Sequence, residues 1–99
     1  MINQKDVCDA IKSRLVVQFY YKGHRRVVEP HLVGEKTNGV IELSAWQIGG
    51  YSESGKQPPW RNYILDEITN FRSTGENFSG IRPGYNPNDQ TMSRIICRL

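Results

Sequence analysis

Residues 15–34, LVVQFYYKGHRRVVEPHLVG, constrain the fold of this chain more than any other stretch, because their pattern is that of a β-hairpin. Residues 16–21 are rich in β-branched and aromatic side chains, which favour a pleated and half-buried strand. Lys22-Gly23 predicts a turn, because glycine adopts a positive φ at little steric cost. Residues 24–33 predict the returning strand. The hairpin therefore combines a core-forming strand pair with the densest positive charge in the sequence.

The alternation of side chains along a strand assigns the two faces of this hairpin. One face of the first strand carries three apolar or aromatic residues: Val17, Phe19 and Tyr21. On the second strand, Arg26 shares a face with Val28 and Pro30. Pro30 has no N–H to donate to a neighbouring strand, so it predicts a bend or a sheet edge. Arg26 is therefore expected to be partly buried and to need an anion as its partner.

The segments around the hairpin predict a helix, a further strand and a loop. An apolar stripe predicts an amphipathic helix over residues 4–13, with Asn3 as its N-cap. Asn38-Gly39 predicts a second tight turn. An alternating strand is expected to follow over residues 40–48. Residues 49–59 predict a loop that is longer than a hairpin connection requires.

The second half of the chain predicts shorter elements. Residues 60–65 predict a fourth strand, and residues 66–69 predict a single turn of helix that leads into a short fifth strand near residues 70–72. Residues 81–91 are rich in proline, glycine and asparagine, which disfavours regular structure. Residues 92–99 predict a final strand. The chain is therefore expected to be mainly β, with a short N-terminal helix and about five antiparallel strands in a small barrel or curled sheet.

Composition indicates which kind of partner and which cellular compartment to expect. The net charge is +3 at pH 7 with a pI of about 9.0, and arginine outnumbers lysine, which favours anionic partners. No apolar run approaches the roughly 20 residues that span a bilayer. The N-terminus lacks a signal-peptide pattern, so a cytoplasmic location is expected. Cys8 and Cys97 form no CxxC motif; a disulfide between them is geometrically possible, but free thiols are expected in a reducing compartment.

The order of these elements resembles the WYL domain, an Sm-like, SH3-type β-barrel found mostly in bacterial regulators and defence systems. The resemblance rests on Ala10-Ile11 and on three strand motifs: Val17-x-Phe19-x-Tyr21, Arg26-x-Val28-x-Pro30 and Arg61-x-Tyr63-x-Leu65-Asp66-x-Ile68. Phe78 matches a later aromatic of the family. The resemblance covers roughly residues 7–79. It implies a five-stranded Sm-like or SH3-like barrel over residues 1–80, a C-terminal extension of the same domain over residues 81–99, and a homodimer.

Two departures from the family bear on its ligand site. Only Leu43 remains of the name-giving Trp-Tyr-Leu triplet, because Ile41 and Glu42 replace the two aromatics. Glu67 stands where the family often carries an arginine used on anionic ligands. The winged helix-turn-helix that usually precedes such domains in transcription regulators does not occur in this sequence. The resemblance therefore implies a stand-alone module whose ligand contacts differ from the family pattern.

The candidate binding residues are basic or aromatic and belong to the hairpin and the fourth strand: Lys22, His24, Arg25, Arg26, Arg61, Tyr21 and Tyr63. Basic side chains neutralise phosphates, and a tyrosine ring offers a face on which a base can stack. The competing interpretation is that a charged hairpin tip only solubilises the chain and protects an edge strand.

Arg26 and Arg61 match arginines of the family and share faces with apolar residues. Each is expected to meet an anion, which is either a ligand phosphate or a carboxylate such as Glu29 or Asp66. Trp46 and Trp60 are open to two interpretations, as stacking platforms or as caps of the core.

The sequence contains no catalytic constellation, metal site or cofactor motif. His24 and His31 lack partners at metal-ligand spacing. A nuclease needs about three converging carboxylates, whereas Asp66-Glu67 is the only adjacent acid pair, and Asp66 is expected to cap the following turn. Three serines lie outside any nucleophile-elbow context: Ser52, Ser54 and Ser79.

The sequence therefore predicts a non-catalytic regulatory module that binds single-stranded DNA or RNA, or a nucleotide, without a membrane or a cofactor. It would pass its binding state to a protein partner or to a second copy of the chain. The alternative is a protein-interaction or oligomerisation module, in which the terminal strand, residues 92–99, adds to the sheet of a partner.

Overall fold

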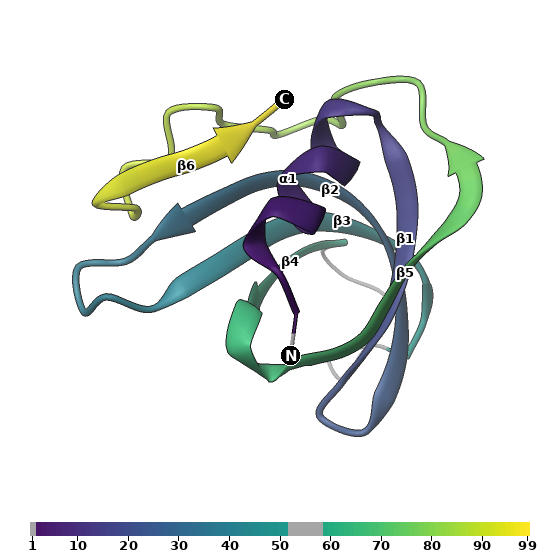
Figure 1. The fold of residues 1–99 in the computed structure, drawn as a ribbon. Coiled ribbons are helices and arrows are strands. Elements are labelled where there is room, and N and C mark those ends of the chain that lie inside the picture. The colour runs from purple at the N-terminus through teal and green to yellow at the C-terminus, as the bar shows by residue number, and fades with distance from the viewer. Residues whose placement is uncertain (1, 52–58) are drawn as a thin grey trace.

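The computed structural model describes residues 2–51 and 59–99, and these form one six-stranded antiparallel sheet with one α-helix (Figure 1). The elements follow in this order: α1 (Gln4–Lys12), β1 (Leu15–Tyr21), β2 (His24–Glu35), β3 (Ile41–Gly50), β4 (Trp60–Ile64), the 3-10 turn η1 (Leu65–Glu67), β5 (Ile68–Asn77) and β6 (Arg94–Arg98). The prediction of a mainly β fold with a short N-terminal helix is confirmed. In the described part of the chain, no helix is long and apolar enough to cross a membrane.

The long strand β2 is the centre of the sheet. The strand order is β4-β3-β2-β1-β5, and β6 pairs with the second half of β2. Along one edge of β2, the pairing with β1 ends at Val28 and the pairing with β6 begins at Leu32. Pro30 lies between these two stretches, where the register against β3 also shifts. The bend predicted at Pro30 is confirmed, and its missing N–H falls where β2 exchanges one neighbour for another.

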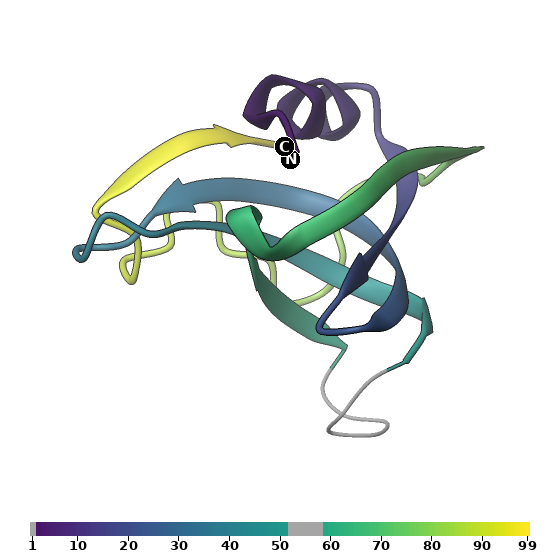
Figure 2. The same cartoon turned by 60° about the horizontal axis from the view of Figure 1, so that its bottom comes forward.

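The sheet curls but hydrogen bonds do not close it into a barrel. Among the described strands, β4 and β5 each pair along one edge only, and η1 connects their ends. Figures 1 and 2 show this open curl, with α1 lying over β2. The final strand predicted over residues 92–99 is confirmed as β6, and it adds a sixth strand to the five of the predicted barrel.

The main core lies between the inner face of the sheet and α1. Val17, Phe19 and Tyr21 are buried, as the alternation of β1 predicts, and Val28 of β2 joins them. The helix contributes Val7, Ala10 and Ile11. Full burial of a side chain such as Ile11 stabilises the fold by roughly 1.5–3 kcal/mol relative to its exposure. The predicted N-cap is confirmed, since Asn3 Oδ1 accepts a hydrogen bond of 2.7 Å from the Lys5 backbone N–H.

Cys8 of α1 and Cys97 of β6 form a disulfide, so the prediction of free thiols is wrong. Their Cα atoms lie 5.8 Å apart although 89 positions separate them in the sequence. The two ends of the chain meet because β6 pairs with β2, and α1 packs against both strands.

Two predicted tight turns are confirmed. Lys22 and Gly23 join β1 to β2 with positive φ angles of 52° and 80°. In the second turn, Asn38 Oδ1 accepts a hydrogen bond of 3.0 Å from the Val40 N–H. Of the loop predicted over residues 49–59, Gly49 and Gly50 belong to β3, and residues 52–58, with Ser52 and Ser54, lie outside the described residues.

Strand β5 is longer than the short strand predicted near residues 70–72. Asn70 adopts a positive φ of 54° at a register shift against β1, and this bulge bends the strand without ending it. The strand therefore continues through residues 75–77, beyond the predicted end. The prediction that Asp66 caps the helical turn is wrong, because η1 has Ile64 at its N-cap and no side-chain cap.

A second cluster of side chains covers the outer face of β2. His31 is fully buried and its ring lies 4.9 to 5.4 Å from the rings of Trp60, Phe78 and Tyr85. The buried carboxylate of Glu29 accepts two hydrogen bonds from the Arg82 guanidinium, at 2.7 and 3.0 Å. As predicted, residues 81–91 form no helix or strand. The side chains of Arg82 and Tyr85 nevertheless anchor this segment to the sheet.

Candidate functional site

Most of the predicted binding residues gather at one end of the curled sheet, around the turn between β1 and β2. Lys22, His24 and Arg25 are exposed there, whereas Arg26 is buried directly after them on β2. Tyr63 reaches the same place from β4, since the Arg26 guanidinium lies 5.9 Å from its ring centre. We call this group of residues, with Tyr51 described below, the basic end.

Arg26 is the central residue of the basic end. Its guanidinium carbon lies 5.6 Å from the ring centres of both Tyr21 and Tyr51, and only 6% of the residue is exposed. One terminal nitrogen donates a hydrogen bond of 3.1 Å to the Tyr21 carbonyl oxygen. The Nε–H is buried and has no hydrogen-bond partner among residues 2–51 and 59–99. A buried donor of this kind is unfavourable unless an acceptor reaches it.

No carboxylate of the described residues lies within ion-pair distance of Arg26. Glu29, one of the two carboxylates predicted as a partner, is held by Arg82 on the outer face instead. Among the described residues, the positive charge of Arg26 therefore meets ring faces, one backbone carbonyl and the Tyr63 hydroxyl, but no carboxylate. Attraction between a guanidinium and an aromatic face is real but weaker than a full ion pair in a dry site.

Tyr21 and Tyr63 hold Arg26 in place and are not exposed ligand contacts. They are 7% and 1% exposed, and the Tyr21 hydroxyl accepts a hydrogen bond of 2.9 Å from the Ile64 N–H. The Tyr63 hydroxyl donates a hydrogen bond of 3.3 Å to Gln47 Oε1. Burial raises the pKa of Tyr63 to about 12, although the nearby positive charges of Arg26 and Arg61 act in the opposite direction. Tyr63 is therefore a neutral hydrogen-bond donor at physiological pH.

Tyr51 is the exposed aromatic residue of this end, and the sequence analysis missed it. Its ring stacks on His24 with a centroid distance of 3.8 Å and an interplanar angle of 22°. Of the residue, 44% is exposed. The Tyr51 N–H donates a hydrogen bond of 2.8 Å to the Arg25 carbonyl oxygen. Gly50 permits this approach, because its φ is 81° and a Cβ there would collide with the Arg25 backbone.

Arg61 and Arg25 extend the positive charge on both sides of Arg26. Arg61 lies half-buried on β4, on the same face as Tyr63, and one terminal nitrogen donates a hydrogen bond of 3.0 Å to the Trp60 carbonyl oxygen. Arg25 pairs with the exposed Tyr20 across β1 and β2, on the face opposite Arg26. The positive charge thus surrounds the end of the sheet instead of occupying one face.

The two tryptophans belong to the outer cluster and not to the basic end. Their rings meet edge to face at 5.5 Å, and the Arg82 guanidinium lies 5.2 Å from the Trp46 ring centre. The Trp60 indole N–H donates a hydrogen bond of 2.8 Å to the Pro83 carbonyl oxygen. Of the two interpretations, the role of packing against the sheet fits these contacts.

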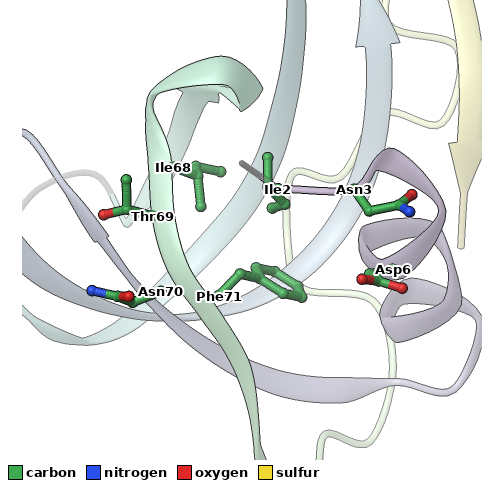
Figure 3. Close-up of a pocket in the computed structure, with 7 residues that line it drawn as sticks. All are labelled: Ile2, Asn3, Asp6, Ile68, Thr69, Asn70 and Phe71. Atoms are coloured by element: carbon green, nitrogen blue, oxygen red, sulfur yellow. The ribbon is translucent and has the colours of Figure 1, made fainter.

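A separate hollow of about 380 Å³ lies between the first turn of α1 and the start of β5 (Figure 3). Ile2, Ile68 and Phe71 lie in its wall, and Asp6 stands at the side of the helix. Its lining includes an acid and no lysine or arginine. This hollow therefore does not suit an anionic ligand, in contrast to the basic end.

Within residues 2–51 and 59–99, no three histidine, cysteine, aspartate or glutamate side chains gather closely enough to hold a metal ion. What the basic end offers is positive charge, a buried N–H that no described residue uses, and the exposed stack of His24 and Tyr51. These groups suit the binding of an oxyanion next to a planar group. A search for similar proteins found no matching family model, curated protein or solved structure.

Proposed function

We propose that the protein is a non-catalytic regulatory module that binds single-stranded nucleic acid or a nucleotide at the basic end of its sheet. The observation that carries this proposal is the buried Arg26: in the described part of the chain, its Nε–H has no hydrogen-bond partner and its charge meets no carboxylate. A phosphate oxygen would supply both the missing acceptor and the missing negative charge. Charge-assisted hydrogen bonds between arginine and phosphate are among the strongest in proteins.

The exposed residues around Arg26 support a ligand that carries more than a phosphate. Lys22, His24 and Arg25 are exposed at the hairpin tip, where they would attract a polyanion over a distance of about one Debye length. The His24 ring stacks on Tyr51, and its outer face would extend this stack to a base. Stacking of a base on an aromatic ring contributes about 1–3 kcal/mol and is tolerant of sequence.

The resemblance to the WYL domain supports the same proposal. Its motifs Arg26-x-Val28-x-Pro30 and Arg61-x-Tyr63-x-Leu65 contribute two arginines to one end of the sheet. We propose on this basis that the open curl is a divergent Sm-like barrel. Glu67, the acid at a family arginine position, is exposed in η1, so the anion contacts would come from β2, β3 and the hairpin tip.

A backbone comparison tests the proposal directly. A fluorescein-labelled single-stranded DNA or RNA is titrated with the protein, and fluorescence anisotropy reports binding. A peptide nucleic acid of the same base sequence serves as the matched control, because it has the bases without the phosphates. We expect saturable binding of the DNA or RNA and none of the control. Equal binding of both would mean that the phosphates do not matter and would overturn the proposal.

The alternative is a protein-interaction module, and the open edges of the sheet favour it. Among the described strands, neither β4 nor β5 pairs along its outer edge, and an open edge can accept a strand from a partner. In β5, the Ser73 and Thr74 hydroxyls already accept hydrogen bonds from the Gly75 and Glu76 N–H groups.

The terminal strand enters this alternative differently from the prediction. β6 already pairs with β2 inside the chain, so it would meet a partner only through its second edge. Sedimentation velocity, with and without oligonucleotide, separates the two functions. A protein that stays monomeric at all concentrations and binds oligonucleotide favours the nucleic-acid module. Concentration-dependent assembly without oligonucleotide binding favours the alternative.

A further inference from the structure

A second, smaller hollow of about 120 Å³ lies on the outer side of the sheet, between β3, β4 and the segment that follows Arg82. Six residues line it: Ser44, Trp60, Gly84, Tyr85, Asn86 and Asp89. None of them belongs to the basic end. A whole drug-sized ligand needs roughly 300 Å³ or more, so this hollow suits a head group.

Two aromatic rings form its apolar part. Trp60 and Tyr85 are nearly parallel, with an interplanar angle of 20° and ring centres 6.1 Å apart. The polar atom of each ring is already bonded to backbone: the indole N–H to the Pro83 carbonyl oxygen at 2.8 Å, and the Tyr85 hydroxyl to carbonyl oxygens at 3.3 Å. The rings are therefore fixed in position and stack on each other, and they line the hollow with the surface that this contact leaves uncovered.

Gly84 keeps the hollow open beside the indole. Its φ is 86°, and a Cβ at this position would lie 3.3 Å from the Trp60 indole nitrogen. A larger residue would therefore push the segment away from the ring or strain its backbone. The hollow depends on this close approach of the chain to Trp60.

Asp89 is the charged residue of the lining. Its Oδ1 accepts hydrogen bonds from the Thr91 N–H at 2.9 Å and from the Thr91 hydroxyl at 2.6 Å, whereas no described residue donates to Oδ2. Two cations of this region are already engaged: the Arg82 guanidinium by both oxygens of Glu29, and the Lys36 ammonium by the Thr91 hydroxyl oxygen at 3.0 Å and by Glu42 at 3.8 Å. A carboxylate oxygen without a partner and two fixed ring surfaces therefore meet in one small hollow.

We propose that this hollow binds the head group of an organic cation of the trimethylammonium class. Aromatic faces attract a methylated ammonium through the ring quadrupole, and such a head group keeps its charge while burying methyl surface. The Asp89 carboxylate adds a counter-ion. Because the ligand has the opposite charge to a phosphate, this site is independent of the proposed function of the basic end.

Tryptophan fluorescence tests this site, because Trp60 is part of it. The variant Trp46→Phe keeps a ring beside Arg82 and leaves Trp60 as the single tryptophan of the chain. Choline is titrated into this protein, and 3,3-dimethyl-1-butanol, the uncharged analogue of the same shape, is the control. We expect a saturable change with choline and binding about tenfold weaker with the alcohol. Equal responses to both compounds, or no saturable response to choline, would overturn the proposal.

The variant Asp89→Asn tests the carboxylate, since asparagine keeps the oxygen that accepts from the Thr91 N–H and loses the charge. We expect its choline affinity to fall about fivefold. The matched control is Glu76→Gln on β5, which removes an exposed acid outside the hollow and should leave the affinity unchanged. Unchanged affinity in a folded Asp89→Asn protein would contradict the site. If that variant does not fold, added sodium chloride should weaken the binding of choline and not that of the alcohol.

Discussion

The guanidinium carbon of Arg26 lies 5.6 Å from the ring centre of Tyr51. Arg26 is a buried residue of β2, whereas Tyr51 follows β3 and is exposed. The Tyr51 ring in turn stacks on His24 at 3.8 Å. Charge, ring and imidazole thus form a continuous stack from the interior to the surface. A ligand that stacks on or replaces the outer ring would come close to the unused N–H of Arg26.

Replacing Tyr51 by alanine should weaken the binding of single-stranded oligonucleotides by about tenfold, because it removes the ring that holds His24 in the stack. Tyr51→Phe keeps the ring and should bind within about twofold of the parent protein. Anisotropy titrations of the three proteins at one salt concentration measure the difference. Equal loss in both variants would point to the hydroxyl instead of the ring and would contradict the stacking role.

Replacing Arg26 by methionine should separate binding from stability. Methionine has a similar length and fills an apolar site well, and the parent residue has no carboxylate partner among the described residues. We expect the free energy of unfolding in urea to change by less than about 1.5 kcal/mol. Oligonucleotide affinity should fall at least about tenfold, because a charge-assisted bond is lost.

Arg26→Lys is the matched control for this change, because it keeps the charge and removes the Nε–H. Intermediate affinity in the lysine variant would show that the position of the donor matters as well as the charge. Affinity equal to that of the parent in a folded Arg26→Met protein would rule Arg26 out as a binding residue.

Stability should fall below about pH 6.5 because of His31. Its Nδ1 lies 2.8 Å from the Glu29 carbonyl oxygen and therefore donates, while Nε2 accepts from the Arg82 N–H at 3.2 Å. Burial lowers the pKa of His31 from 6.5, so the unfolded state binds the proton more strongly. The stabilisation is complete above the unfolded pKa and is lost as the pH falls, by up to about 1.4 kcal/mol per pH unit.

Urea unfolding at pH 7.5 and at pH 5.5 checks this sign. His31→Gln should have a lower stability at pH 7.5 and a smaller change between the two pH values. A loss of stability that is unaffected by His31→Gln would assign the pH dependence to other groups.

The disulfide between Cys8 and Cys97 should contribute about 4–5 kcal/mol of stability in the chain-entropy model, because it closes a loop of nearly the whole chain. Tris(2-carboxyethyl)phosphine should therefore lower the Tm of the parent protein. The double variant Cys8→Ser, Cys97→Ser should have the lower Tm with or without reductant. A Tm that does not respond to reductant, together with two titratable thiols, would contradict the bond.

This disulfide bears on the predicted cytoplasmic location. Structural disulfides persist in oxidising compartments and are rare in a reducing cytosol. Alkylation of the free thiols in lysed cells that express the protein, before and after reduction, would report the redox state of the pair in its own compartment.

The local elements were predictable because short-range patterns determine them. The faces of β1 follow from the alternation of Val17, Phe19 and Tyr21, and the turn at Lys22-Gly23 follows from the backbone freedom of glycine. The N-cap at Asn3 has a local cause of the same kind. Each of these features depends on residues that are close together in the sequence, so a single sequence is sufficient to predict them.

The missed features depend on contacts between distant segments. The disulfide requires β6 to pair with β2 beside α1, and no local pattern encodes that pairing. The Glu29–Arg82 pair was missed for the same reason, since Arg82 lies in a segment without regular structure. Tyr51 carried one usable signal: it follows Gly49-Gly50, and Gly50 with its positive φ allows the chain to approach Arg25.

The salt dependence of oligonucleotide affinity is the most direct test of the central proposal. The logarithm of the affinity should fall linearly with the logarithm of the salt concentration, because phosphates that are neutralised by the protein release counter-ions. Arg25→Ala should reduce the magnitude of this negative slope by about one. Lys12→Ala removes the same charge from α1 and should leave the slope unchanged. Flat anisotropy traces at low salt, or equal slopes in all three proteins, would contradict binding at the basic end.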